Sequence, residues 1–266
     1  MTRTLRAALV FLLAALCAAG LAVAPAQAMA DNDGDGLDDG LEDAVAANFF
    51  PYVWFDSGED GGCTDPATDG NPGTAVARVR PHPADASKIA ISYAILYRRD
   101  CGDWWGGGHN GDVEPFTLTL APNGACQYGF GVLGLKTIAH EGTAFEHVDQ
   151  VAIGNACDWG RLAGGSPQVA RIYSAENKHG NYASLGSCED GALGNDHCSE
   201  SFTRDYNVVN AGEDGARRVD ELSGFQFPGE FAWTAQPFSG SLGAGGGEAG
   251  LVRDKLLNDG LLPPAA

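Results

Sequence analysis

The amino-acid sequence predicts an all-β fold, an antiparallel β-sandwich with long loops. Several short segments alternate with a period of two, which is typical of strands. The stretches between them are rich in glycine, proline, aspartate and asparagine, which favour turns. Helical patterns are short, so we expect only a helix that leaves an N-terminal calcium loop and a short C-terminal helix over 250–258.

The first 28 residues have the form of a secretory signal peptide. Arg3 and Arg6 give a basic start, 7–23 is an apolar run, and 26–28 is an A-x-A cleavage site. A membrane anchor is the weaker alternative, because Pro25 interrupts the run. We therefore predict a secreted, extracellular protein of about 238 residues with no transmembrane segment after signal cleavage.

The mature chain is predicted to be strongly acidic, since removal of the two signal-peptide arginines takes the formal net charge from −19 to −21. Such a chain is not expected to bind nucleic acid through its phosphates, or anionic membranes by charge alone. Extracellular carboxylates suit calcium, although most of them need only keep the protein soluble.

Residues 29–48 are predicted to form an EF-hand-like calcium loop and its exiting helix. Residues 31–42 fit the spacing D-x-[DN]-x-[DN]-G-x5-E without a gap, and Gly36 permits the sharp turn. No entering helix fits before the loop, which favours a structural clip over a paired sensor; the alternative is a solvated acidic tail. The predicted ligands of Ca²⁺ are Asp31, Asp33, Asp35, Leu37 through its carbonyl, Asp39 and Glu42.

Residues 49–266 are predicted to form a single β-sandwich domain. The aromatic run 49–55 should anchor the clip to the core, and 56–73 is expected to be a long loop. The clearest strand is 89–97, whose odd-numbered residues are all isoleucine or tyrosine, with the small residues Ala90, Ser92 and Ala94 on the other face. Further strands are expected at 76–79, 112–120, 128–139, 144–153, 169–175, 206–210 and 225–227, with a glycine-rich linker at 239–250.

Six cysteines remain after signal cleavage, and an even number in an exported chain predicts three disulfides. One pairing follows from a hairpin: a two-residue turn at 141–142 would pair 128–139 with 144–153 so that partner numbers sum to 283, which Cys126 and Cys157 satisfy. A second pair closes a local loop, and the third takes the two cysteines that remain. The predicted disulfides are Cys126–Cys157, Cys188–Cys198 and Cys63–Cys101.

Segment 100–114, D-C-G-D-W-W-G-G-G-H-N-G-D-V-E, is the main candidate for a functional site. Asp112 and Glu114 are two apart on a predicted strand, so they share a face with a buried apolar row. Ionised carboxylates are costly there unless a cation neutralises them. An imidazole with several carboxylates suits Ca²⁺, Mg²⁺ or Mn²⁺; the alternative is a glycine-rich loop whose acids face water. The predicted ligands are Asp100, His109, Asp112 and Glu114.

Other side chains are candidates for contact with a ligand at this site. His179 follows the strand 169–175 in a glycine-asparagine turn, and it is a candidate metal ligand or acid/base, with an ordinary turn histidine as the alternative. Lys178 lies beside it in sequence. Trp104 and Trp105 suit stacking on a sugar or insertion at a membrane interface.

Zinc chemistry is not expected. The histidine–glutamate pairs at 140–141 and 146–147 lack the H-E-x-x-H spacing, and both are predicted to be surface residues of a hairpin. None of the six cysteines has the CxxC spacing of a zinc–thiolate site.

These motifs resemble those of two known families. G-H-N-G-D-V-E at 108–114 resembles the H-x-G-D-W-E segment of the vacuolar protein sorting-associated protein 62 family. It is also similar to the G-H-R-H-D-W-E segment of the necrosis- and ethylene-inducing-like proteins. The resemblance extends to 94–100, 173–175 and 178–182. The first family implies a fold and a site only.

The second family consists of β-sandwich cytolysins that hold a divalent cation and bind sphingolipid head groups. This resemblance implies that His109, Asp112 and Glu114 occupy metal-site positions, with Asp100 as a further acidic ligand. The sequence departs from that family's motif at Asn110, Gly111 and Val113.

Together these features predict a secreted, metal-binding β-sandwich protein that recognises a polar lipid head group or a glycan, and the resemblance implies a toxin-like effector. We favour a binding protein over an enzyme. The alternatives are a metal-dependent extracellular hydrolase, in which His179 or Glu114 moves protons, and a structural extracellular module.

Overall fold

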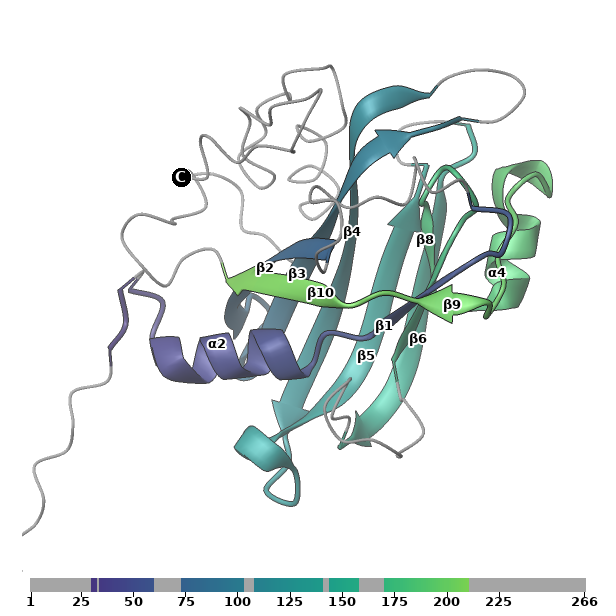
Figure 1. The fold of residues 1–266 in the computed structure, drawn as a ribbon. Helices are drawn as coiled ribbons and strands as arrows, with labels where there is room; N and C mark the ends of the chain where they lie inside the picture. Colours follow the sequence, from purple (N-terminus) through teal and green to yellow (C-terminus); the bar gives the residue numbers. More distant parts are fainter. Residues whose placement is uncertain are drawn as a thin grey trace, which may run out of the picture. The chain divides into compact units, whose positions relative to one another are not determined.

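The computed structural model describes residues 30–32, 34–59, 73–102, 108–140, 144–157 and 170–210. Contacts divide the chain into Met1–Ala30 and Asp31–Ala266, and every described helix and strand belongs to the second unit. These elements form an all-β fold of two sheets with few short helices, as the sequence predicts (Figure 1). The predicted signal peptide, the strand at 225–227, the glycine-rich linker and the C-terminal helix lie outside the described residues.

The larger sheet has six strands in the order β10-β2-β3-β4-β5-β6. Neighbouring strands pair antiparallel except β10, which pairs parallel with β2. β3 is longer than the alternating segment 89–97, because it continues to pair with β2 or β4 at both ends. The bounds are β2 Gly73–His82, β3 Asp85–Asp100, β4 His109–Pro122, β5 Phe130–Ala139, β6 His147–Ala156 and β10 Tyr206–Asn210.

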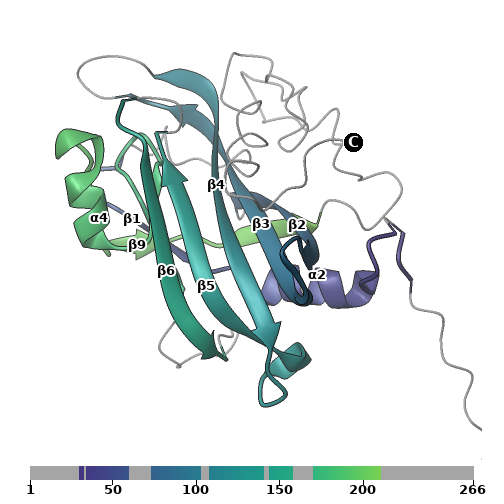
Figure 2. The same cartoon turned by 180° about the vertical axis from the view of Figure 1, so that it is seen from behind.

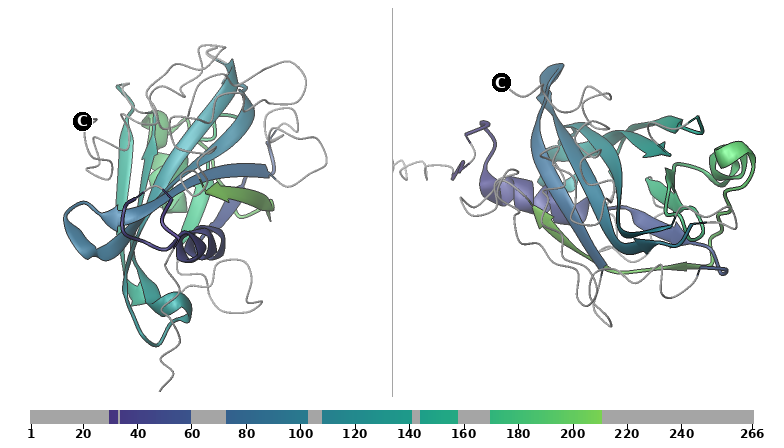
Figure 3. Two further views of the ribbon diagram at one scale, coloured as in Figure 1. Left: turned by 90° about the vertical axis from the view of Figure 1, so that its left-hand side faces the viewer. Right: turned by 90° about the horizontal axis from the view of Figure 1, so that it is seen from above.

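The smaller sheet has four short strands in the order β8-β7-β1-β9. β1 pairs parallel with β7 and antiparallel with β9, so the aromatic run at 49–55 contributes a central strand. Figure 3 shows this sheet and the helix α2 (Asp39–Asn48) on one side of the larger sheet. The bounds are β1 Tyr52–Phe55, β7 Arg171–Ser174, β8 Asn181–Tyr182 and β9 Phe202–Thr203; the helix α4 is Leu185–Asp190.

The core lies between the two sheets and α2. The odd-numbered residues of β3 from Ile89 to Tyr97 are all buried in it, as the alternation predicts. Phe50 meets Tyr93 edge to face with ring centroids 5.2 Å apart, and the Tyr93 hydroxyl donates to the Ala46 carbonyl at 2.9 Å. The aromatic run therefore anchors α2 to the sheet, since aromatic rings bury much apolar area and their polar tips need a partner.

β4 keeps a continuous register through Pro115. Ala94 lies opposite Pro115, and β5 pairs with β4 only from Phe116 onward. Proline cannot donate to a ladder, but it is tolerated where a neighbouring strand has ended. The alternation is therefore unbroken, and Glu114 is buried like Phe116, with 4 % of its surface exposed.

The predicted two-residue turn between β5 and β6 is wrong. β5 ends at Ala139 and β6 begins at His147, and partner numbers sum to 286, not 283, from Ala139↔His147 to Gly134↔Ala152. The connection is therefore longer than two residues. His140, its first residue, has a left-handed φ of +55°, and its Nε2 lies 2.6 Å from Asp196 Oδ2.

The disulfide inferred from that register is nevertheless present. Cys126 and Cys157 are bonded with a Cα–Cα distance of 5.1 Å. A 3₁₀ turn (Gln127–Gly129) and a register shift between Val132 and Gly134 bring the two cysteines together. Cys188–Cys198 is also confirmed. Cys101 is disulfide-bonded, and its predicted partner Cys63 lies outside the described residues.

Candidate functional site

The N-terminal acidic loop folds around the carboxylate of Asp31, its first aspartate. The Asp31 carboxylate accepts hydrogen bonds from the backbone N–H groups of Gly34 at 2.8 Å, Asp35 at 3.0 Å and Gly36 at 3.1 Å. Gly36 has a φ of +96°, a left-handed conformation that favours glycine. The sharp turn predicted at this position is confirmed.

The predicted last ligand of the calcium loop is buried in the first turn of α2. Asp38 caps this helix by accepting from the Leu41 N–H at 3.1 Å, and acids in the first turn suit the helix dipole. Glu42 is 0 % exposed, and both of its carboxylate oxygens and Oδ2 of Asp35 are shielded from solvent. Buried carboxylates require compensating positive charge.

Two neighbouring groups contact or lie near the predicted calcium ligands. Asp39 is held by Asn32, whose N–H and Nδ2 donate to its two oxygens at 2.9 and 2.7 Å. Burial and Arg78 lower the pKa of Arg80 to about 10, whereas Asp35 acts to raise it, so a guanidinium also lies near Asp35. Asp33 lies outside the described residues.

The strand pair β3 and β4 brings only two of the predicted central ligands opposite each other, and Glu114 lies five residues further along β4. Asp100 lies opposite His109, and Ile95 lies opposite Glu114. The side chains of His109 and Asp112, and the residues Trp104 and Trp105, lie outside the described part of the chain.

Segment 175–182 packs against the ends of these two strands. The Cys101 N–H donates to the Asn177 carbonyl at 2.9 Å, and Nδ2 of Asn181 donates to the Glu114 carbonyl at 3.2 Å. Asp100 Oδ1 accepts from the Gly102 N–H at 2.5 Å, which turns the chain at the end of β3. The two motifs singled out in the sequence therefore lie side by side.

His179 is fixed inside this segment. It has a φ of +60° and is 0 % exposed, and its ring stacks on Tyr97 with centroids 3.9 Å apart. Its Nε2 lies 3.1 Å from Oε1 of Glu59, whose side chain is also fully buried. The other oxygen of Glu59 accepts from the Asn177 N–H at 3.0 Å. Glu59 was missed in the sequence because it lies in a loop with no periodic pattern.

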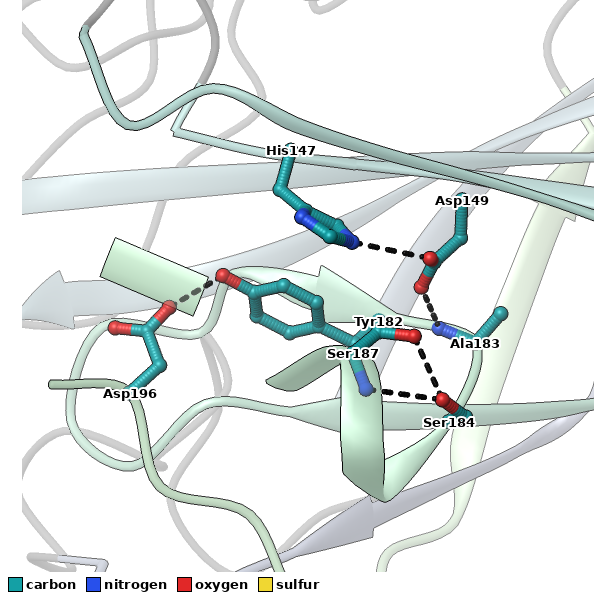
Figure 4. Close-up of polar contacts among 7 residues, drawn as sticks. All are labelled: His147, Asp149, Tyr182, Ala183, Ser184, Ser187 and Asp196. Carbon is teal, nitrogen blue, oxygen red and sulfur yellow. Dashed lines mark hydrogen bonds and ion pairs between the residues drawn. The ribbon is translucent and has the colours of Figure 1, made fainter. Parts of the chain in front are cut away.

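A second acid–histidine network lies beside Glu114. The Tyr182 hydroxyl donates to Oδ2 of Asp196, which also lies 2.6 Å from Nε2 of His140 (Figure 4 shows the tyrosine contact). Burial and Asp196 raise the pKa of Tyr182 far above its usual value, and Glu114 contributes to this rise. Burial raises the pKa of Asp196, but His140, Tyr182 and Lys178 together outweigh it, so the carboxyl pKa lies below its ordinary value.

The interpretation of His140 as a surface residue is wrong, since its side chain is only 16 % exposed. Its partner Asp196 is distant in sequence, so no local spacing marked the contact. His147 is more exposed and pairs with Asp149 at 3.1 Å, and the Asp149 carboxylate accepts from the Ala183 N–H at 2.8 Å (Figure 4).

Metal binding at either predicted site stays a prediction. Among the residues that the structure describes, no three histidine, cysteine, aspartate or glutamate side chains form a group that could hold an ion. Asp33 and the side chains of His109 and Asp112 are not among them. No helix in the described ranges is long and apolar enough to cross a bilayer.

The described residues thus define a two-sheet, disulfide-bonded β protein with buried acid–histidine pairs at one corner. No protein-family model matches the chain, and no curated protein matches it. The resemblance to the vacuolar protein sorting-associated protein 62 family therefore stays a prediction.

Three solved structures are similar to the chain. "NLPPya in complex with glucosamine" is 16% identical with a TM-score of 0.42, covering 89% of this chain and 100% of that chain. "Toxin fold for microbial attack and plant defense" is 17% identical with a TM-score of 0.40, covering 75% and 90%. Necrosis and Ethylene inducing Protein 2 from the causal agent of cocoa's Witches Broom disease is 15% identical with a TM-score of 0.33, covering 62% and 72%. The last is named for the class that 108–114 resembles.

Proposed function

We propose that the protein is a secreted, toxin-like binding protein that recognises a polar lipid head group or a glycan through a divalent cation at segment 100–114. The observation that carries this proposal is the packing of segment 175–182 against the ends of β3 and β4. It places the buried carboxylate of Glu114 and the Glu59–His179 pair around the strand pair that carries Asp100. Carboxylates with an imidazole, as the proposed ligand set has them, suit Ca²⁺, Mg²⁺ or Mn²⁺.

In this proposal Asp100, His109, Asp112 and Glu114 hold the cation, which when bound supplies positive charge for oxygen atoms of the ligand. Glu59 positions the segment 175–182 by accepting from Asn177 and contacting His179. Full burial of the His179 ring against Tyr97 favours a positioning role over proton transfer to an open site. Binding is therefore favoured over hydrolysis.

A second cation is proposed at the N-terminal loop, as a structural clip. Asp31 organises the loop and Glu42 is buried, while α2 presents Val45 and Ala46 to the core. An ion bound by the loop and by Glu42 would fix the start of the helix to the sheet.

The central proposal is tested with Glu114→Gln, which removes the buried charge but keeps the shape. Calcium, magnesium and manganese binding is measured by calorimetry. Binding to phosphatidylcholine vesicles with and without a glycosylated sphingolipid, and to glucosamine, is measured with and without EDTA. We expect EDTA to abolish ligand binding and Glu114→Gln to weaken cation binding at least tenfold, as loss of a charged partner costs about 1.5–3 kcal/mol.

Glu200→Gln is the matched control, because Glu200 pairs with Arg171 on the surface. It should bind cation and ligand like the wild type. Ligand binding that survives both EDTA and Glu114→Gln would contradict the proposal.

A further inference from the structure

The face of the larger sheet that points away from the core carries a pocket lined in part by basic side chains. Its volume is about 610 Å³, and strands β2 to β6 all contribute to its lining. Figure 2 shows the molecule with β5 and β6 toward the viewer. The lining residues used below are His82, Lys88, Thr117, Thr119, Lys136 and Gln150.

Strand alternation places the polar lining of this pocket away from the core, although the core residue Leu135 of β5 also lines it. In β4 the core residues are Phe116 and Leu118, whereas the odd-numbered Thr117 and Thr119 line the pocket. In β3 the core residues have odd numbers, and Lys88 has an even one. The pocket therefore lies on the opposite face of the sheet from Glu114.

The register explains both the pocket's shape and its chemistry. One row across β4, β5 and β6 consists of Thr117, Lys136 and Gln150, which are mutual cross-strand partners. The next row consists of Thr119, Gly134 and Ala152. Small residues in the second row leave room above the sheet, and the first row supplies the ammonium of Lys136 and the amide of Gln150 beside that room, whereas Thr117 is buried.

Positive charge gathers here although the chain has 35 acidic and 16 basic residues. Burial lowers the pKa of His82, and Lys88 and Arg80 lower it further, against an opposing effect of Asp85. Lys88 pairs with Asp85 at 3.0 Å, but both are partly exposed, at 32% and 41%. An exposed pair of this kind is weak, so a ligand anion can compete for the ammonium group.

We propose that this pocket binds a small polyhydroxylated anion, a sugar acid or a sugar phosphate. Lys88 and Lys136 supply the positive charge for the anionic group, and Thr119 and Gln150 bind the hydroxyls. The volume lies within the range of small-molecule sites, about 300–1,000 Å³. The site needs no metal and goes beyond the proposed function.

The test is calorimetric titration of the full chain in EDTA, which separates this site from the cation-dependent one. The probes are glucuronate, glucose 6-phosphate, glucose and inorganic phosphate. We expect one or both sugar anions to bind at least tenfold more tightly than glucose and than phosphate, since hydrogen bonds to charged groups are stronger than those between neutral groups. A preference between the two sugar anions identifies the anionic group.

Lys136→Gln should weaken binding of the preferred sugar anion at least tenfold, and Lys88→Gln provides a second variant at the hairpin end of the pocket. Arg204→Gln is the matched control, because it removes one positive charge near Phe202 in the other sheet. Unchanged melting temperatures show that the variants fold. The proposal would be overturned if Arg204→Gln weakened binding of the sugar anion as much as Lys136→Gln does. It would also be overturned if glucose or inorganic phosphate bound as tightly as the preferred sugar anion.

Discussion

At the scale of single residues, the buried carboxylates and their partners decide what this corner of the protein can do. Asp196 illustrates this, because one of its oxygens serves both Tyr182 and His140. Removal of its charge leaves a buried hydroxyl and an imidazole with a poorer acceptor, which costs free energy of folding.

We therefore predict that Asp196→Asn lowers the free energy of unfolding by about 2 kcal/mol near neutral pH. The folded-state pKa of Asp196 lies below 3.8, the ordinary value, so its contribution is full above that pH and is lost as pH falls through the folded-state value. Urea unfolding at several pH values should show the wild type and the variant converging below about pH 4.

A difference that stays constant from neutral pH to about pH 3 would contradict this linkage. Glu189→Gln is the control, since Glu189 is exposed on α4. It should unfold like the wild type at every pH.

Features of single residues could be predicted from the sequence where they depend on the alternation of side chains along one strand. The buried row of β4, and the burial of Glu114 at its end, follow from alternation. The partner of His179 could not be predicted in this way, because Glu59 is 120 positions away and only the tertiary fold brings the two residues together.

At the scale of elements, α2 and the loop before it act as one unit. The cap, the acids of the first turn and the left-handed Gly36 all follow from sequence signals that act over a few residues. The β5–β6 register could not be predicted from such local signals, because the length of a loop depends on what its residues contact. His140 contacts Asp196, which is 56 positions away, and the observed partner numbers sum to 286 rather than the 283 of a two-residue turn.

Calcium should raise the melting temperature of the wild type, because a ligand that binds only the folded state stabilises it. Glu42→Gln should abolish this calcium-dependent rise. Scanning fluorimetry in EDTA and in calcium measures both effects. Asp43→Asn is the control, since Asp43 is exposed on the same helix and should leave the rise unchanged. A rise that persists in Glu42→Gln would rule out the clip.

At the scale of the whole molecule, stability depends on cross-links as well as on the core. Cys126–Cys157 spans 31 positions and Cys188–Cys198 spans 10. Both bonds restrict the unfolded chain, and the longer loop restricts it more.

Replacement of both Cys126 and Cys157 by serine should lower the free energy of unfolding by about 3–4 kcal/mol, and replacement of Cys188 and Cys198 by somewhat less. Guanidinium unfolding of the two double variants, with the wild type as reference, measures this order. The reverse order would show that local strain or packing outweighs the length of the closed loop.

The two faces of the larger sheet are also distinct at this scale. The inner face carries the core and, at its end, Glu114, whereas the outer face carries Lys136 between polar neighbours. The alternation of each strand determined this division, but the pocket itself depends on five strands and could not be located from any one of them.

The pairing of β1 has a consequence for biosynthesis. Tyr52–Phe55 is made early, yet both of its neighbours, Arg171–Ser174 and Phe202–Thr203, are made late. The smaller sheet cannot be complete before Thr203 has been made, and its closure brings together distant parts of the sequence, which is slow. Until then β1 has no strand to pair with in the smaller sheet. A nascent or truncated chain therefore exposes an unpaired, aromatic strand that is prone to aggregate.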